Sequence, residues 1–162
     1  MNPTRAFPIN TPLLRKILAG ALASGLLMAG VTQALAQTSP DATLTAAAKE
    51  PGAKVTASGL VIRMTKEGAG AQPTATSTVK VHYKGRFPDG KEFDSSYKRN
   101  EPIEFPLSGV IKCWTEGVAL MKVGGAAKLT CPSSIAYGAR GAGGVIPPNA
   151  TLVFEVELLG VR

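Results

Sequence analysis

Residues that could carry acid–base, nucleophilic or metal chemistry are scarce in this sequence of 162 residues. Its one histidine, His82, and its two cysteines, Cys113 and Cys131, are too few and too far apart for the clustered ligands of a zinc site. No serine stands in the strained glycine-flanked turn that exposes a nucleophile, and a catalytic triad would have to use His82, which we interpret as an ordinary strand residue. The glycine-rich run at 141–144 leads into two prolines and not into a helix, which argues against a phosphate-binding loop. We therefore expect neither a metal nor a cofactor.

The second half of the sequence supplies aromatic side chains instead. All aromatic residues except Phe7 lie beyond position 80: Tyr83, Phe87, Phe93, Tyr97, Phe105, Trp114, Tyr137 and Phe154. Such residues can either fill a hydrophobic core or line a dry apolar cleft, and composition alone leaves both interpretations open. Tyr137 favours a cleft, because a tyrosine beside glycine in a loop is an unusual packing choice.

Short strands dominate the region that must position these side chains. Alternation of apolar and polar residues predicts strands near 79–83, 127–131 and 152–158. Shorter extended pieces are expected at 60–64, 92–94 and 103–105, with a turn at 88–91. The one helical pattern begins at Lys112 and ends near Met121, before two glycines. We predict an α+β fold in which an antiparallel sheet covers one short helix.

The first 36 residues have the pattern of a secretory signal peptide. Three basic residues and no acidic one precede an uncharged apolar stretch that ends in the tripeptide Ala-Leu-Ala. We therefore predict cleavage after Ala36 and a periplasmic or secreted protein. The alternative is an uncleaved membrane anchor, since the apolar stretch approaches the ~20 residues that span a bilayer. Its glycines and Gln33 make it a poor permanent anchor, and no stable membrane insertion is expected after cleavage.

The net charge is ordinary once this segment is set aside. The whole chain carries 18 basic and 11 acidic residues, a formal charge of +7, and three of those basic residues lie in 1–36. Because the others are dispersed along the chain, no nucleic-acid partner is expected. Residues 37–54 are rich in Ala, Thr, Ser and Pro, and 43–50 could form only a marginal helix too short to stand alone. We interpret 37–54 as a flexible tether and 55–162 as the one folded domain, which we expect to be monomeric.

The order of motifs after the tether resembles the FKBP-type peptidyl-prolyl cis-trans isomerases. The motifs that carry the resemblance are VHYKG at 81–85, DGKEFDSS at 89–96, VIKCWTEG at 110–117, AYG at 136–138 and IPPNATLVF at 146–154. The resemblance extends over 55–162, about two-thirds of the chain. It implies an FKBP-like antiparallel half-barrel sheet wrapped around one short helix, with a hydrophobic cleft between them.

The resemblance also implies a role for particular residues of that cleft. Trp114 would form its floor, and Asp94 would stand at its rim beside Arg99, either to orient a dipole or only to tie down the rim. The Tyr137 hydroxyl and the Ile111 backbone N–H would hold the carbonyl groups of the substrate. The residues expected to take part in catalysis are Tyr83, Asp94, Trp114, Tyr137 and Phe154. The residues expected to bind substrate are Phe93, Arg99, Ile103, Val110, Ile111 and Ile146. Ile103 is aliphatic where the family often has an aromatic wall residue.

The reaction of that family suits a chain without catalytic acids or nucleophiles, because rotation about an X–Pro bond breaks no bond. The expected function is isomerisation of X–Pro bonds during the folding of exported proteins, and the expected partners are proline-containing unfolded or nascent exported polypeptides. Macrolide inhibitors would fill the cleft. The alternative is a non-catalytic FKBP-fold chaperone or peptide-binding module. The family fold also brings Cys113 near Cys131, which after export would form a disulfide or remain two buried thiols.

Overall fold

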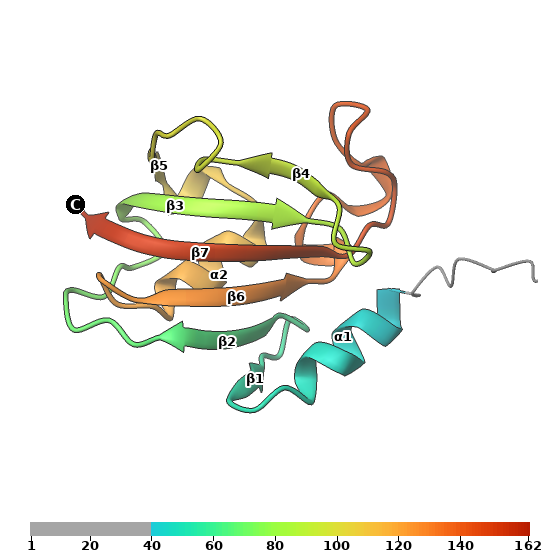
Figure 1. Cartoon of the computed structure of the whole chain (residues 1–162), viewed down its shortest axis with the longest axis horizontal. Helices are drawn as coiled ribbons and strands as arrows, with labels where there is room; N and C mark the ends of the chain where they lie inside the picture. The colour runs from blue at the N-terminus through green and yellow to red at the C-terminus, as the bar shows by residue number, and fades with distance from the viewer. Residues whose placement is uncertain (1–39) are drawn as a thin grey trace, which may run out of the picture. The chain divides into compact units, whose positions relative to one another are not determined.

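The computed structural model describes residues 40–162, so the predicted signal peptide and its cleavage site lie outside the described residues. The helices are α1 (Pro40–Ala48) and α2 (Lys112–Ala119) (Figure 1). The strands are β1 (Ala53–Val55), β2 (Val61–Lys66), β3 (Thr78–Arg86), β4 (Glu92–Ser95), β5 (Ile103–Pro106), β6 (Ala126–Cys131) and β7 (Leu152–Val161). Single helical turns lie at Leu107–Gly109, Ser133–Ile135 and Gly138–Arg140. No helix within 40–162 is long and apolar enough to cross a membrane.

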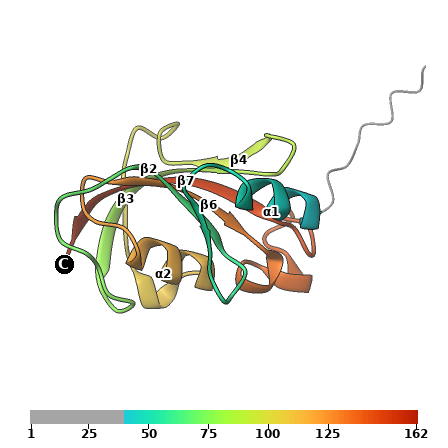
Figure 2. The ribbon, with the colours of Figure 1, turned by 90° about the horizontal axis from the view of Figure 1, so that it is seen from below.

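All seven strands form one antiparallel sheet in the order β1-β2-β6-β7-β3-β4, with β5 also paired to β3. β7 lies between β6 and β3, where alternate residues from Leu152 to Leu158 are buried. The outer edge of β3 is shared, because its first half pairs with β5 and its last residues pair with β4. The sheet curves over α2, as Figure 2 shows. The predicted α+β half-barrel around a short helix is confirmed.

Helix α2 lies directly against β6. Gly117 permits the approach, since a Cβ there would lie 2.8 Å from both terminal methyl carbons of Leu129. Cys113 of α2 and Cys131 of β6 form a disulfide with a Cα–Cα distance of 5.9 Å, and both side chains are fully buried. Of the two alternatives for Cys113 and Cys131, the structure therefore shows the disulfide and not two buried thiols. It anchors the first turn of α2, where Trp114 stands.

The expected flexible tether over 37–54 is wrong for its described part. Residues 40–48 form α1, and β1 pairs with β2. Ala47 is only 6% exposed, and Glu50 forms ion pairs with Arg63 of β2 (2.8 Å) and Lys128 of β6 (2.5 Å). A helix this short is marginal alone, so its stability comes from tertiary packing and charge pairing that the local sequence does not reveal. The folded unit therefore includes residues from 40 onward and not only 55–162.

Candidate active site: an aromatic cleft

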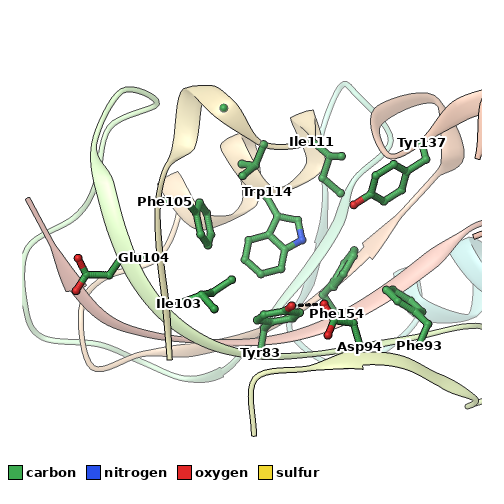
Figure 3. A pocket seen from close by; sticks show the side chains of 12 residues that line it. Tyr83, Phe93, Asp94, Ile103, Glu104, Phe105, Ile111, Trp114, Tyr137 and Phe154 are labelled. Carbon is green, nitrogen blue, oxygen red and sulfur yellow. Dashed lines mark hydrogen bonds between the residues drawn. The ribbon is translucent and has the colours of Figure 1, made fainter. Parts of the chain in front are cut away.

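An open cleft of about 650 Å³ lies between the start of α2 and the concave face of the sheet (Figure 3). It is lined mainly by aromatic and aliphatic side chains. The lining residues are Tyr83, Phe93, Asp94, Ile103, Glu104, Phe105, Gly109, Val110, Ile111, Trp114, Tyr137 and Phe154. Glu104 stands at one end of the cleft, and Phe93 and Tyr137 stand at the other.

Trp114 forms the centre of this lining, and other aromatic rings hold its indole in place. It is 6% exposed and belongs to the first turn of α2. Its ring centroid lies 5.2 Å from that of Tyr83 and 5.3 Å from that of Phe154, both edge-on, and 5.4 Å from that of Phe105. Edge-to-face pairs of this kind stabilise a ring beyond its burial alone. The floor is therefore rigid and preformed.

The polar part of the rim is a closed network of three side chains. The Tyr83 hydroxyl donates to Asp94 Oδ2, and Arg99 donates from Nη1 to Asp94 Oδ1 (2.5 Å) and from Nη2 to the Tyr83 hydroxyl (3.0 Å). The Ser95 backbone N–H completes the set with a bond to Asp94 Oδ1 (2.8 Å). Because three donors converge on its two oxygens, the network fixes the orientation of the Asp94 carboxylate.

These contacts also decide the protonation states at the rim. Burial alone would raise the pKa of Asp94, but the hydrogen bonds from Tyr83 and Arg99 outweigh it and hold that pKa below its usual range. Burial and the bond to Asp94 raise the pKa of Tyr83. At neutral pH, Asp94 is thus an anion and Tyr83 a neutral phenol, so neither is poised to exchange protons with a substrate. Within 40–162, no three His, Cys, Asp or Glu side chains converge as metal ligands.

Two of the donors expected to hold the substrate have no acceptor among residues 40–162. One is the hydroxyl of Tyr137, a residue that is 37% exposed and points into the cleft from the far side (Figure 3). The other is the backbone N–H of Ile111, which precedes α2 and has no carbonyl partner in the described chain. The segment before α2 is held in place by Thr115, whose hydroxyl donates to the Leu107 carbonyl (2.6 Å). Both residues line the cleft, so these two donors are available to a substrate beside the apolar floor.

The structure brings most of the predicted site residues together. Arg99 does not line the cleft itself but reaches its rim through Asp94 and Tyr83. Ile146 is buried in the same core cluster as Trp114 but lines a neighbouring cleft. All the other predicted residues line the aromatic cleft. The prediction missed Glu104, Gly109 and Phe105, although the period of two along β5 could have indicated that Phe105 faces the same side as Ile103.

A strongly curved sheet over one short helix, with a tryptophan floor and an aromatic wall, defines a class of protein. The sequence matches the family of FKBP-type peptidyl-prolyl cis-trans isomerases over residues 70–159, which is more than half of the chain. The chain belongs to this family.

Particular relatives support this assignment. The chain is 56% identical over 119 residues to the FKBP-type peptidyl-prolyl cis-trans isomerase FkpA of Aeromonas hydrophila, covering 74% of this chain and 44% of that protein. It is 57% identical over 103 residues to FK506-binding protein 1 of Dictyostelium discoideum, covering 62% of this chain and 96% of that protein. The crystal structure of FkpA from Escherichia coli superposes with a TM-score of 0.74 at 49% identity, covering 76% of this chain and 57% of that one. The chain thus spans about half the length of its FkpA relatives.

Proposed function

We propose that this protein accelerates cis–trans isomerisation of X–Pro bonds in polypeptides. The observation that carries the proposal is the rigid aromatic cleft with its floor at Trp114, which presents two unpartnered donors and no group poised for proton transfer. Family membership supports the same conclusion.

Electrostatics and shape account for the reaction without covalent chemistry. The uncatalysed barrier of ~18–20 kcal/mol comes from amide resonance, which places partial negative charge on the carbonyl oxygen. In a dry cleft the planar, more dipolar amide is disfavoured relative to the twisted state, in which that resonance is lost. The proline ring would rest on Trp114, while the Ile111 N–H and the Tyr137 hydroxyl hold flanking carbonyl groups. Asp94, fixed by Tyr83 and Arg99, would supply an oriented charge at the rim.

A protease-coupled assay on short proline peptides tests this function. We expect acceleration by the wild-type chain, a large loss of kcat/KM in Trp114→Leu and a smaller loss in Tyr137→Phe. Tyr97→Phe is the matched control, because this tyrosine lies outside the cleft and binds Glu157. Absence of acceleration with every residue tested before proline would refute the proposal. Peptide binding without acceleration would instead identify a non-catalytic binding module. Ile103 favours that alternative, because the family often has an aromatic residue at this position of the wall.

The substrates we propose are unfolded or nascent exported polypeptides. We further propose that the protein is a monomer located in the periplasm or outside the cell. A buried disulfide supports this location, because such bonds persist in oxidising compartments. Sequencing the N-terminus of the exported protein tests the cleavage after Ala36, and analytical ultracentrifugation tests the monomer.

We also propose that macrolides occupy the cleft, since one relative is named an FK506-binding protein. Their binding should quench the fluorescence of Trp114, the one tryptophan of the chain.

A further inference from the structure

A second cleft, of about 770 Å³, lies between the β3–β4 turn and the loop that precedes β7. Its lining combines apolar and charged side chains. The lining residues are Phe87, Asp89, Lys91, Arg140, Gly141, Ala142, Gly143, Gly144, Val145, Ile146, Pro147 and Pro148. None of them lines the aromatic cleft, and only Ile146 was predicted to bind substrate.

The two clefts adjoin at one end of the aromatic cleft. Phe93 and Tyr137 stand together at that end (Figure 3). The ring of Phe93 packs against Phe87 of the second cleft, with centroids 5.0 Å apart. On the opposite rim, the single helical turn Gly138–Arg140 leads from Tyr137 to Arg140. Both rims of the aromatic cleft therefore continue into the second cleft. A substrate polypeptide that extends beyond this end of the aromatic cleft would pass over the second cleft.

The loop that forms one wall of the second cleft is a hydrogen-bonded structure. Ala142 and Ile146 exchange two backbone hydrogen bonds of 2.9 Å each. Gly141 has φ of 65°, and a Cβ there would lie 2.2 Å from the Ile146 carbonyl oxygen, so only glycine fits the turn. Val145 is exposed while Ile146 is buried beneath the loop. This wall is therefore preformed, which lowers the entropy lost when a peptide binds.

The charges of the second cleft favour an anion. Lys91 and Arg140 are exposed, and no carboxylate of residues 40–162 forms an ion pair with either of them. Asp89 accepts the Lys91 backbone N–H through Oδ1 (2.9 Å), and with its carboxylate counted the lining still carries two cations against one anion. The far end of the aromatic cleft differs, because Glu104 there is paired with Arg162 (2.8 Å) and Lys80 (3.7 Å).

We propose that the second cleft binds the part of the substrate polypeptide next to the isomerising proline and selects an acidic side chain there. This inference rests on the proposed function. The ring centroids from Trp114 through Phe154 and Phe93 to Phe87 are 5.3, 5.7 and 5.0 Å apart, so the path is at most about 16 Å. An extended chain advances about 3.3 Å per residue, which places the selected side chain within about five residues of the proline. Its carboxylate would meet Lys91 and Arg140 above the apolar floor.

The test uses peptides with one X–Pro bond and a glutamate or a glutamine at each of five positions on either side of the proline. On one side, we expect glutamate to raise kcat/KM of the wild-type chain about 1.5- to 5-fold over glutamine, which is the range of an exposed ion pair. The preference should disappear in Lys91→Gln/Arg140→Gln and at high salt. The matched control, Lys66→Gln/Lys122→Gln, removes the same charge from exposed positions that line neither cleft and should keep the preference.

Equal turnover of glutamate and glutamine peptides at every position would overturn the inference, as would a preference that survives in Lys91→Gln/Arg140→Gln. A short peptide without charges separates this outcome from failure of the proposed function. The wild-type chain and Lys91→Gln/Arg140→Gln should accelerate its isomerisation equally. If neither enzyme accelerates it, the proposed function fails as well. A wild-type dimer that becomes monomeric in the double variant would show that a second copy of the chain occupies the cleft, and would likewise overturn the inference.

Discussion

Removing the disulfide between α2 and β6 should lower the free energy of unfolding by about 3 kcal/mol. The bond joins residues separated by 18 positions, and the loop-closure entropy of the unfolded chain for that separation amounts to about 3 kcal/mol at 25 °C. Cys113→Ala/Cys131→Ala is the suitable variant, because serine would bury two hydroxyl groups that lack acceptors. Both cysteines are fully buried, so loss of packing at the two sulfur positions adds to the entropic effect.

Urea denaturation followed by Trp114 fluorescence measures the change. With a slope of about 1.5 kcal/mol per molar urea, the midpoint should fall by about 2 M. A reductant should lower the midpoint of the wild-type chain toward that of the variant and should leave the variant unchanged. In the absence of urea, the variant should keep kcat/KM within about twofold, because three rings hold Trp114 independently of the sulfur bridge. A midpoint within 0.5 M of the wild-type value would refute the reasoning.

Three further predictions concern other contacts. Gly117→Val should destabilise the fold by about 1–3 kcal/mol in urea denaturation, because its side chain would overlap Leu129. An unchanged midpoint would contradict this and would mean that Leu129 and β6 can move away from α2. Since the pKa of Asp94 is lowered by folding, its contribution to stability is present above the unfolded pKa of about 3.9 and is lost as the pH falls through the folded value. The midpoint of Asp94→Asn should therefore depend less on pH between 5 and 2 than that of the wild-type chain; parallel profiles would contradict this. Glu50→Gln should speed amide hydrogen exchange in α1 while changing the free energy of unfolding by about 1 kcal/mol or less, and unchanged exchange would contradict the role given to its ion pairs.

The sequence predicted the parts of the fold that depend on local periodicity. Alternation marked β7 correctly, because one face of that strand is buried and the other carries Glu155 and Glu157. The helix was placed at Lys112 from its apolar spacing, and the structure ends it at Ala119, two residues before the predicted end. A marginal helix at 43–50 was considered but was set aside for a tether, because little in the local sequence shows that α1 would be stable. Just after its end, Glu50 forms ion pairs with Arg63 and Lys128, which are distant in the sequence.

The site was predicted by family motifs, and its gaps have physical causes. Motifs name residues, but the bend of a loop decides which cleft a side chain enters. Ile146 belongs to the same buried cluster as Trp114, but it lines the second cleft and not the aromatic one. Phe105 was absent from the predicted lining, although β5 places both Ile103 and Phe105 on the cleft. The second cleft joins residues about 50 positions apart and has no contiguous sequence pattern.

The position of β7 in the sheet sets when this protein can fold during its synthesis. β7 pairs with β3 on one side and with β6 on the other, yet it is the last strand in chain order. Until residues 152–161 have been made, the inner edges of both neighbouring strands have no partner, and the half-barrel cannot close over α2. Ribosomes add about 5–20 residues per second, so the incomplete chain persists for seconds without its central strand. The sheet can therefore close only after β7 has been synthesised behind β3 and β6, and the edges of those two strands that will contact β7 stay unpaired until then.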